Sequence, residues 1–543
     1  MIRHKAFWAG LILLITGILS FVYWSSQKQI WFTDEIYSYE SSNGFEQDWP
    51  SSQIGQWMTG SDIEAYLSAD SDHLSFDAIS DRLYSDHVPL YFWLFRLVSF
   101  LFFPGSGSIW IGLVINLFFY LFVLVLGYGF FLRLTSSPLL SATVMFFTAV
   151  VNRLMLQQAT ILRMYMLLLW AMLLLLMGGL WVLQDCKRPK MSPVLFIYLY
   201  IISVIGLLTH YDFWIFYAIT AALFCLWLLI LAVRKGRLRF WTTGEFKYVL
   251  AWVGNFAASL LTTIFLFPYC RWNLNRGKGE TALKSIFDFS AKKLQDIGWG
   301  YERLSACLFG EKFPPILGLL LIFGCILDGA VLLYKRKEMQ KLTGLILTVL
   351  TAQAYQFVVC FTFPADREER YLWCVYTILL FCMAWGAILL LQALLSLVKD
   401  AAVRKMAGRI TYAILAIGIL AAEWLVIDSG KGIEYLSHPA KDMSVLQAHS
   451  DIPWVVYGQV TGAHSYYDWT LPEQICFLTL EDTPEDLAAV KELRDTDSFL
   501  VYIPGDYRDQ AVTYFQEELG RKFDSQFLTN SIKYNVYLMS ATK

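Results

Sequence analysis

Long apolar runs are the feature that most constrains this chain. Of its 543 residues, 57% are hydrophobic and only 16% are charged, whereas soluble domains have about 45–50% apolar residues. Several runs reach the roughly 20 residues that a helix needs to cross the hydrocarbon core of a bilayer. The sequence therefore predicts a helical integral membrane protein.

The first apolar run, at 6–24, follows Arg3 and Lys5 and has the charged start of a signal peptide. It ends without a small-x-small cleavage pattern, so we expect an uncleaved membrane span. Eight later runs are also long enough to span. They lie near 163–183, 192–209, 213–233, 247–269, 315–334, 341–362, 371–397 and 410–428.

Basic clusters occupy alternate gaps between these runs. They are Lys187-Arg188-Lys190, Arg234-Lys235-Arg237-Arg239, Lys335-Arg336-Lys337, and Arg404-Lys405 with Arg409. By the positive-inside rule these gaps and the N-terminus are cytoplasmic. The remaining segments then face outward: 26–88, the turn at 209–212, the loop 270–314, the segment 363–370, and everything after 428.

Three apolar runs fall between His87 and Arg163, at 89–104, 108–132 and 138–151. Both ends of this region are expected outside, so an even number of crossings is required. We therefore expect one run, either 91–103 or 138–162, to lie along the interface, to be re-entrant or to be split. The predicted total is 11 spans, or 13 if a further crossing occurs here.

The composition becomes that of a soluble domain after the last span. Strand-like runs occur at 454–457, 475–480, 499–503 and 535–539, and helix-like runs at 484–494 and 507–519. The predicted fold is thus an all-α polytopic membrane domain, residues 1–428, followed by a small extracytoplasmic α/β domain, residues 429–543.

Charge and cysteine content exclude other classes. The 43 basic and 45 acidic residues nearly balance, and no recognition motif for nucleic acid is present. The nine cysteines form no C-x-x-C pair and no spacing suited to zinc. No chain of ionisable residues runs through the spans, and no repeat relates two halves, so a transporter gains no support.

An acidic pair, Asp34 and Glu35, follows the first span. One interpretation is a helix start, with Thr33 or Asp34 as N-cap and Glu35 in the first turn. The other is that Asp34 is a general base for an acceptor hydroxyl and that Glu35 orients it. Adjacent residues cannot face each other across a substrate, so this is not the carboxylate pair of a glycosidase.

Further polar and aromatic groups are expected on the same face. Each one alone fits an interface anchor or a structural residue as well as a ligand. Together with the acidic pair they predict a substrate-binding site at the outer membrane boundary. The candidate binding residues are His87, Arg163, Tyr165, His210, Tyr211, Arg367, Arg370 and Tyr371.

These groups, in this order, resemble the C-superfamily of glycosyltransferases (GT-C), and within it the family 39 branch of protein O-mannosyltransferases and the lipid A aminoarabinose transferase. The resemblance covers about residues 1–428. Its motifs are Asp34-Glu35, His87-Val88-Pro89-Leu90-Tyr91, Arg163-Met164-Tyr165, Thr209-His210-Tyr211 and Arg370-Tyr371. Val88 stands where many relatives have a second proline, and Ile161-Leu162-Arg163 replaces Gln-Glu-Ala-Arg. These departures bear on which substrate class the resemblance implies more than on the resemblance to the superfamily.

The resemblance implies a polyprenyl-phosphate sugar donor and an acid, at Asp34, that acts on the acceptor. Attack opposite the phosphate inverts the anomeric configuration. Arg163 and Arg370 are the candidates for binding the phosphate, because a guanidinium binds phosphate bidentately. With arginines in this role we expect no obligatory cofactor, although Asp34, Glu35 and Asp86 offer oxygen ligands to a divalent metal.

The acceptor class stays open among the hydroxyls of a glycan, a lipid or a protein. Alternatives to this transferase are a lipid or polysaccharide transporter, and a polysaccharide polymerase or ligase with a diphosphate-linked donor. We expect a bacterial plasma membrane, because the Thr542-Lys543 end lacks a eukaryotic retention signal.

Overall fold

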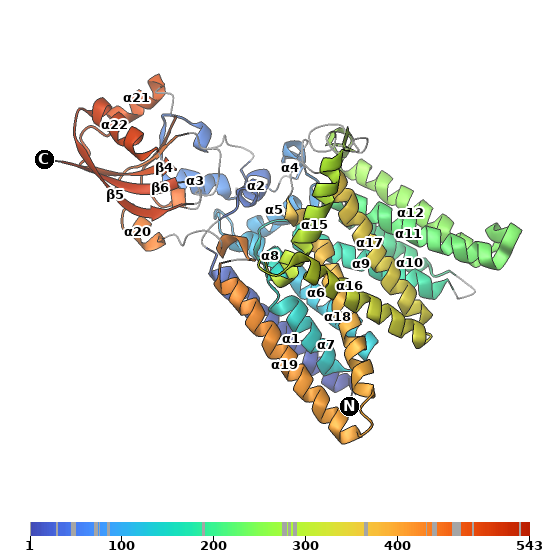
Figure 1. Cartoon of the computed structure of the whole chain (residues 1–543). Coiled ribbons are helices and arrows are strands. Elements are labelled where there is room, and N and C mark those ends of the chain that lie inside the picture. The colour runs from blue at the N-terminus through green and yellow to red at the C-terminus, as the bar shows by residue number, and fades with distance from the viewer. Residues whose placement is uncertain are drawn as a thin grey trace.

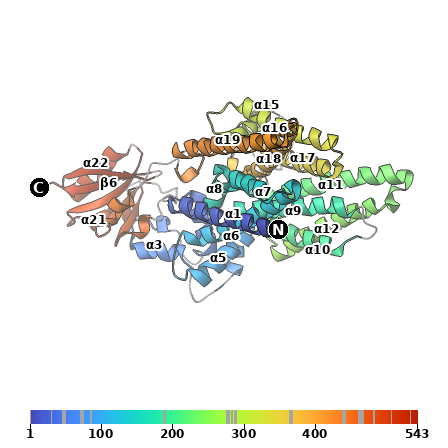
Figure 2. The same ribbon diagram turned by 90° about the horizontal axis from the view of Figure 1, so that it is seen from below.

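The computed structural model shows a helical bundle with a mixed sheet domain at one end (Figure 1), and the view from below shows the same arrangement (Figure 2). It describes residues 2–542, with gaps. The gaps are 29–30, 45–49, 70–73, 75, 84–86, 187–190, 274–279, 281–283, 286–289, 363–367, 431, 437–441, 459–467, 480–482, 506 and 532–533.

Long apolar helices form the bundle. Within the described residues, nine are long and apolar enough to cross a membrane. They are α1 (Ile2–Ser26), α6 (Trp110–Thr135), α9 (Tyr165–Asp185), α11 (Tyr211–Gly236), α12 (Gly244–Leu266), α16 (Pro315–Lys335), α17 (Met339–Thr362), α18 (Trp373–Ser396) and α19 (Ala401–Asp428). The chain is thus a polytopic helical membrane protein, as predicted.

The region between His87 and Arg163 contains one long helix, α6, and two irregular pieces. Helix α5 (Leu90–Phe102) has 13 residues, too few to cross alone. Helix α7 (Pro138–Met145) continues as a π-helical turn, and α8 (Arg153–Thr160) follows at a bend of 60°. Counting this bent pair as one span gives ten. The expected total of 11 stays a prediction, since it also requires α10 (Pro193–Leu207), which has only 15 residues.

The C-terminal region forms most of a six-stranded sheet of order β1-β3-β2-β4-β6-β5. Strand β2 (Trp454–Tyr457) lies between β3 (Ile475–Leu478) and β4 (Ser498–Pro504), parallel to both. Next come β6 (Tyr534–Ala541) and the edge strand β5 (Phe523–Asn530), both antiparallel to their neighbours. The central strands are buried on both faces, which explains their continuous apolar runs.

Helices α21 (Pro484–Lys491) and α22 (Arg508–Leu519) cover one face of this sheet (Figure 1). They and the four strands β2, β3, β4 and β6 coincide with the runs expected from the sequence. Strand β5 was not expected, because its residues are largely polar and partly exposed. The short helix α20 (Met443–Gln447) lies near the other face.

The sixth strand comes from the first loop of the chain. Strand β1 (Trp57–Met58) pairs antiparallel with β3, and the indole Nε1 of Trp57 donates to the carbonyl of Ala489 at 3.2 Å. Helix α3 (Gly60–Leu67) follows, and the amide of Gly60 donates to the carbonyl of Pro472. The first loop and the C-terminal domain therefore form one unit, which was not predicted.

Candidate functional site

Glu35 anchors the first turn of helix α2 (Thr33–Ser42), which follows the first span. Its buried carboxylate accepts from the amide of Phe32 at 2.6 Å and from the amide of Leu162 at 2.7 Å, and it contacts Lys28 Nζ at 2.8 Å. Phe32 is the N-cap residue, so the expectation that Thr33 or Asp34 caps the helix was wrong. Through its hydrogen bond with Leu162, Glu35 connects helix α2 to the segment that contains Arg163.

Asp34 lies beside Glu35 in the same turn, but its side chain points to a different environment. Its carboxylate is 21% exposed, and Oδ2 lies 3.0 Å from Nη2 of Arg370. In the described part of the chain, no group of three His, Cys, Asp or Glu residues is arranged for a metal ion. Asp86, which was considered as a metal ligand, lies outside the described residues.

Arg163 is buried, with only 2% of its surface exposed. Its Nη1 donates to the backbone carbonyl of Asp34 at 2.9 Å and contacts the Ser38 hydroxyl at 3.3 Å. Its Nη2 donates to Nε2 of His87 at 3.2 Å. Arg163 thus connects helix α2, the end of the first loop and the segment before α9.

Tyr165, His210 and Tyr371 form an aromatic group next to Arg370. The ring centroids of Tyr165 and His210 are 6.0 Å apart, and those of His210 and Tyr371 are 6.2 Å apart. His210 is the N-cap of α11 and accepts from the amide of Asp212 at 3.1 Å. Tyr211 lies in the first turn of α11, where its ring contacts Trp214.

Arg370 belongs to a 3-10 turn, η4 (Glu369–Tyr371), just before span α18. Besides Asp34, it contacts the carboxylate of Glu368 at 3.5 Å, and its guanidinium lies over the Phe32 ring at 5.1 Å. Burial lowers the pKa of Arg370, but the neighbouring Tyr165, Asp34, Tyr371 and Glu368 together raise it by more, so the group stays charged. Arg367 lies outside the described residues.

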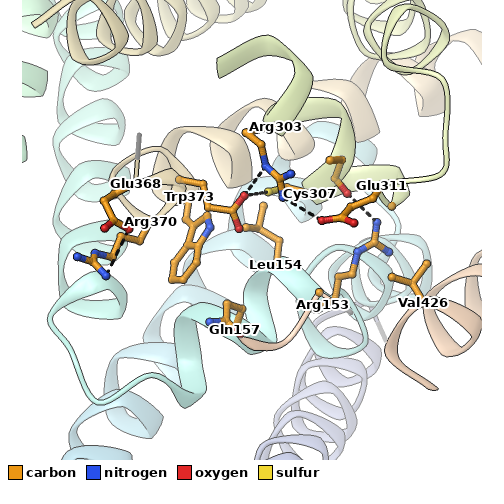
Figure 3. A pocket seen from close by; sticks show the side chains of 14 residues that line it. Arg153, Leu154, Gln157, Arg303, Cys307, Glu311, Glu368, Arg370, Trp373 and Val426 are labelled. Atoms are coloured by element: carbon orange, nitrogen blue, oxygen red, sulfur yellow. Dashed lines mark hydrogen bonds and ion pairs between the residues drawn. The ribbon is translucent and has the colours of Figure 1, made fainter. Parts of the chain in front are cut away.

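A cavity of about 350 Å³ opens beside Arg370 (Figure 3). Its walls come from α8, from α15 (Ala291–Phe309), from η4 and α18, and from the end of α19. The lining combines charged residues with apolar ones, and Trp373 is its large aromatic residue. The charged residues are Arg153, Arg303, Arg370, Glu311, Glu368 and Glu369.

Arg153 and Arg303 were not among the expected site residues. Arg153, at the start of α8, pairs with the buried Glu423 of span α19 at 2.9 Å and donates to the carbonyl of Ala306 at 3.4 Å. Arg303 of α15 pairs with Glu369 at 2.6 Å. A carboxylate inside a span is itself a signal of a buried partner, so Glu423 was the clue in the sequence.

The structure therefore brings together Asp34, His87, Arg163 and Arg370 through direct contacts, and Tyr165, His210 and Tyr371 through ring contacts. Of these residues, only Arg370 lines the cavity. Asp34 does not line the cavity, but it contacts Arg370, which does.

No family model matches the chain, and no curated protein matches it in sequence. Solved structures do match it over nearly its full length. One is the crystal structure of ArnT from Cupriavidus metallidurans in the apo state, with a TM-score of 0.48 and 11% identity over 97% of each chain. Another is the archaeal oligosaccharyltransferase AglB from Archaeoglobus fulgidus in complex with an inhibitory peptide and a dolichol-phosphate. Its TM-score is 0.44, with 11% identity over 96% of this chain and 74% of that one. Both are GT-C glycosyltransferases.

Proposed function

We propose that the protein transfers a sugar, with inversion, from a polyprenyl-phosphate donor to an acceptor hydroxyl at the outer face of the membrane. One observation carries this proposal: Arg370 contacts the carboxylate of Asp34 and also lines a cavity that holds two further arginines. The proposed base and a cavity lined by three arginines and three glutamates thus share a single guanidinium.

Asp34 is the proposed general base. Its backbone is fixed, because Glu35 holds the first turn of α2 and Arg163 binds the carbonyl of Asp34 itself. Its carboxylate is partly exposed, so an acceptor hydroxyl has access to it. Asp34 takes the hydroxyl proton while the acceptor oxygen attacks the anomeric carbon. A positioned base of this kind contributes about 10²- to 10⁴-fold to the rate.

The cavity is the proposed site of the donor phosphate. Breaking the bond between the anomeric carbon and the phosphate oxygen leaves a second negative charge on the phosphate. Arg370 and Arg303 are the guanidiniums placed to stabilise this charge, whereas Arg153 stays paired with Glu423. Fixed donors at a developing charge are worth about 3–4 kcal/mol each on mutation.

Arg163 takes a different role in this mechanism from the one expected of it. Both of its terminal nitrogens bind groups of the protein, and the side chain is buried. We assign Arg163 and Glu35 to positioning Asp34, and Arg370 to the phosphate. The aromatic residues Tyr165, His210 and Tyr371 pack beside Arg370 and are proposed to line the sugar site.

The remaining predictions belong to the same proposal. Residues 1–428 form the transferase domain with 11 spans, counting α10 and the bent pair, and residues 429–543 lie on the extracytoplasmic side. The carrier is undecaprenyl phosphate if the membrane is a bacterial plasma membrane. The acceptor is a hydroxyl of a glycan, a lipid or a protein.

Transfer of radiolabelled sugar in membranes carrying the protein tests the proposal. A panel of polyprenyl-phosphate sugars would be offered to the wild type, to Asp34→Asn, and to Asp524→Asn as a control with an exposed carboxylate in the sheet domain. We expect Asp34→Asn to lose at least about 100-fold in rate at matched expression, and the control to keep full activity. Full activity of Asp34→Asn would remove Asp34 as the base, and no transfer by the wild type from any donor would favour a transporter or a diphosphate-dependent enzyme.

A further inference from the structure

The cavity contains carboxylates that a simple phosphate site does not need. Glu311, Glu368 and Glu369 line it together with the arginines (Figure 3). Each guanidinium already contacts at least one carboxylate, so a phosphate must either replace some of these pairs or do without direct contacts. The pairs fall into two kinds.

The first kind is short. Arg153 and Glu423 lie 2.9 Å apart with side chains 3% and 9% exposed. Glu423 also accepts from the side-chain amide of Asn152 at 3.0 Å and from the backbone amide of Arg153. Breaking this buried pair leaves a poorly solvated charge, so Glu423 is expected to stay in place. Arg303 and Glu369 lie 2.6 Å apart with side chains 28% and 33% exposed, and their close contact is expected to be kept.

The second kind is longer, and its glutamates are more exposed. Arg303 lies 3.6 Å from Glu311, whose side chain is 49% exposed, and Arg370 lies 3.5 Å from Glu368, whose side chain is 41% exposed. Both glutamates stand outside regular helices, just after α15 and just before η4. Exposed pairs at such distances contribute little to stability. The contacts of these two glutamates with the arginines can therefore be exchanged for solvent at small cost.

The lipid phosphate is a stronger partner for the same guanidiniums. The donor is a phosphodiester with two free oxygens, which an arginine binds bidentately, and the polyprenyl phosphate product is a monoester with three oxygens and more charge than one carboxylate. Lipid phosphate in the cavity would replace Glu311 at Arg303 and Glu368 at Arg370, while Glu369 holds Arg303 and Asp34 holds Arg370 in place.

We propose that Glu311 and Glu368 are placeholder anions of the donor site. They neutralise Arg303 and Arg370 when the cavity is empty, turn to solvent when the lipid phosphate binds, and return to help displace the polyprenyl phosphate product. This role rests on the proposed function, and it makes the two glutamates positioning residues that set the affinity for the carrier.

The consequence is a gain of affinity, which a merely structural role would not produce. Replacing a placeholder by its neutral isostere removes a competitor of the phosphate and a negative charge near it. We expect Glu311→Gln and Glu368→Gln each to bind a lipid phosphate about twofold to fivefold more tightly, the ratio set by losing one exposed ion pair. Product release, and with it kcat, should slow in the same variants.

Binding of farnesyl phosphate to the purified full-length protein in nanodiscs tests this role. Wild type, Glu311→Gln, Glu368→Gln and the double variant would be compared with Glu302→Gln, which removes an exposed carboxylate from helix α15, next to Arg303. We expect the tightest binding for the double variant and an unchanged affinity for Glu302→Gln.

Equal affinity of all five proteins, or weaker binding by the Glu311 and Glu368 variants, would overturn the placeholder role and leave the proposed function standing. If none of the proteins bound farnesyl phosphate, the cavity would not be a phosphate site, and both the placeholder role and the proposed donor pocket would fail.

Discussion

Two arginines near Asp34 are held in opposite ways. Arg163 is buried, and its terminal nitrogens contact a backbone carbonyl, a hydroxyl and an imidazole. Arg370 contacts two carboxylates and borders a cavity. An arginine whose terminal nitrogens bind groups of the protein away from a cavity stabilises a local fold, whereas one that pairs with carboxylates at a cavity wall is suited to a ligand anion. The surroundings of Arg163, which include Glu35 and are called the sealed region below, should therefore respond differently to mutation from the surroundings of Arg370, which border the cavity.

The largest expected effect is on the stability of the sealed region. Glu35→Ala leaves Lys28 buried without its carboxylate and the amides of Phe32 and Leu162 without an acceptor. Breaking a buried pair of this kind costs about 3–5 kcal/mol. We expect a lower midpoint of thermal unfolding in detergent together with lost transfer. Unchanged thermal unfolding would contradict the anchoring role of Glu35.

Arg370→Ala should separate activity from stability. We expect transfer to slow by about 10²- to 10³-fold, because the donor phosphate loses its guanidinium, with a nearly unchanged unfolding midpoint. Arg508→Ala, which removes an exposed arginine of the sheet domain, serves as control. A large loss of stability with little loss of kcat would mean that Arg370, like Arg163, stabilises the local fold and does not bind the phosphate.

Arg163→Met should show the reverse pattern. The variant loses charge-assisted hydrogen bonds to α2 and His87, each worth about 1.5–3 kcal/mol. Unfolding should occur at a lower temperature, and the affinity for farnesyl phosphate should stay near the wild-type value. A selective loss of farnesyl phosphate binding, at wild-type stability, would return Arg163 to the phosphate-binding role expected from the sequence.

The smallest effect is expected at Phe32, whose ring lies 5.1 Å below the Arg370 guanidinium. Phe32→Leu keeps an apolar side chain but removes the cation–π contact, worth about 0.5–1 kcal/mol. We expect the KM for the donor to rise about twofold to fivefold at constant kcat, measured in the same transfer assay. A change in kcat without a change in KM would mean that Phe32 acts on Asp34 rather than on Arg370.

The sequence predicts the membrane-embedded part well, because length and polarity alone decide whether a run can span. The central strands β2, β3 and β4 are equally clear, since burial on both faces makes them continuously apolar. By contrast, β1 has only two residues, and its pairing with β3 joins positions more than 400 apart, Trp57 and Cys476. No local pattern reports such a contact.

The candidate site residues could be named from the sequence, but their arrangement could not. The acidic pair and the basic-aromatic groups were visible as motifs, whereas the different partners of Asp34 and Glu35 depend on the fold. The pairing of Arg153 with Glu423 spans 270 positions. Arg303 lies in a segment, 270–314, for which the sequence indicated only that it faces outward, so its place in the cavity wall depends on the fold.

The anomeric configuration of the product, with the identity of the released lipid, tests the central claim most directly. After transfer from a polyprenyl-phosphate sugar of known anomeric configuration, NMR of the isolated product should show the inverted configuration, with one polyprenyl phosphate released per sugar transferred. Retention of configuration, or transfer that proceeds only from a diphosphate-linked donor, would contradict the proposed attack with Asp34 as base and the cavity as the site of a monophosphate.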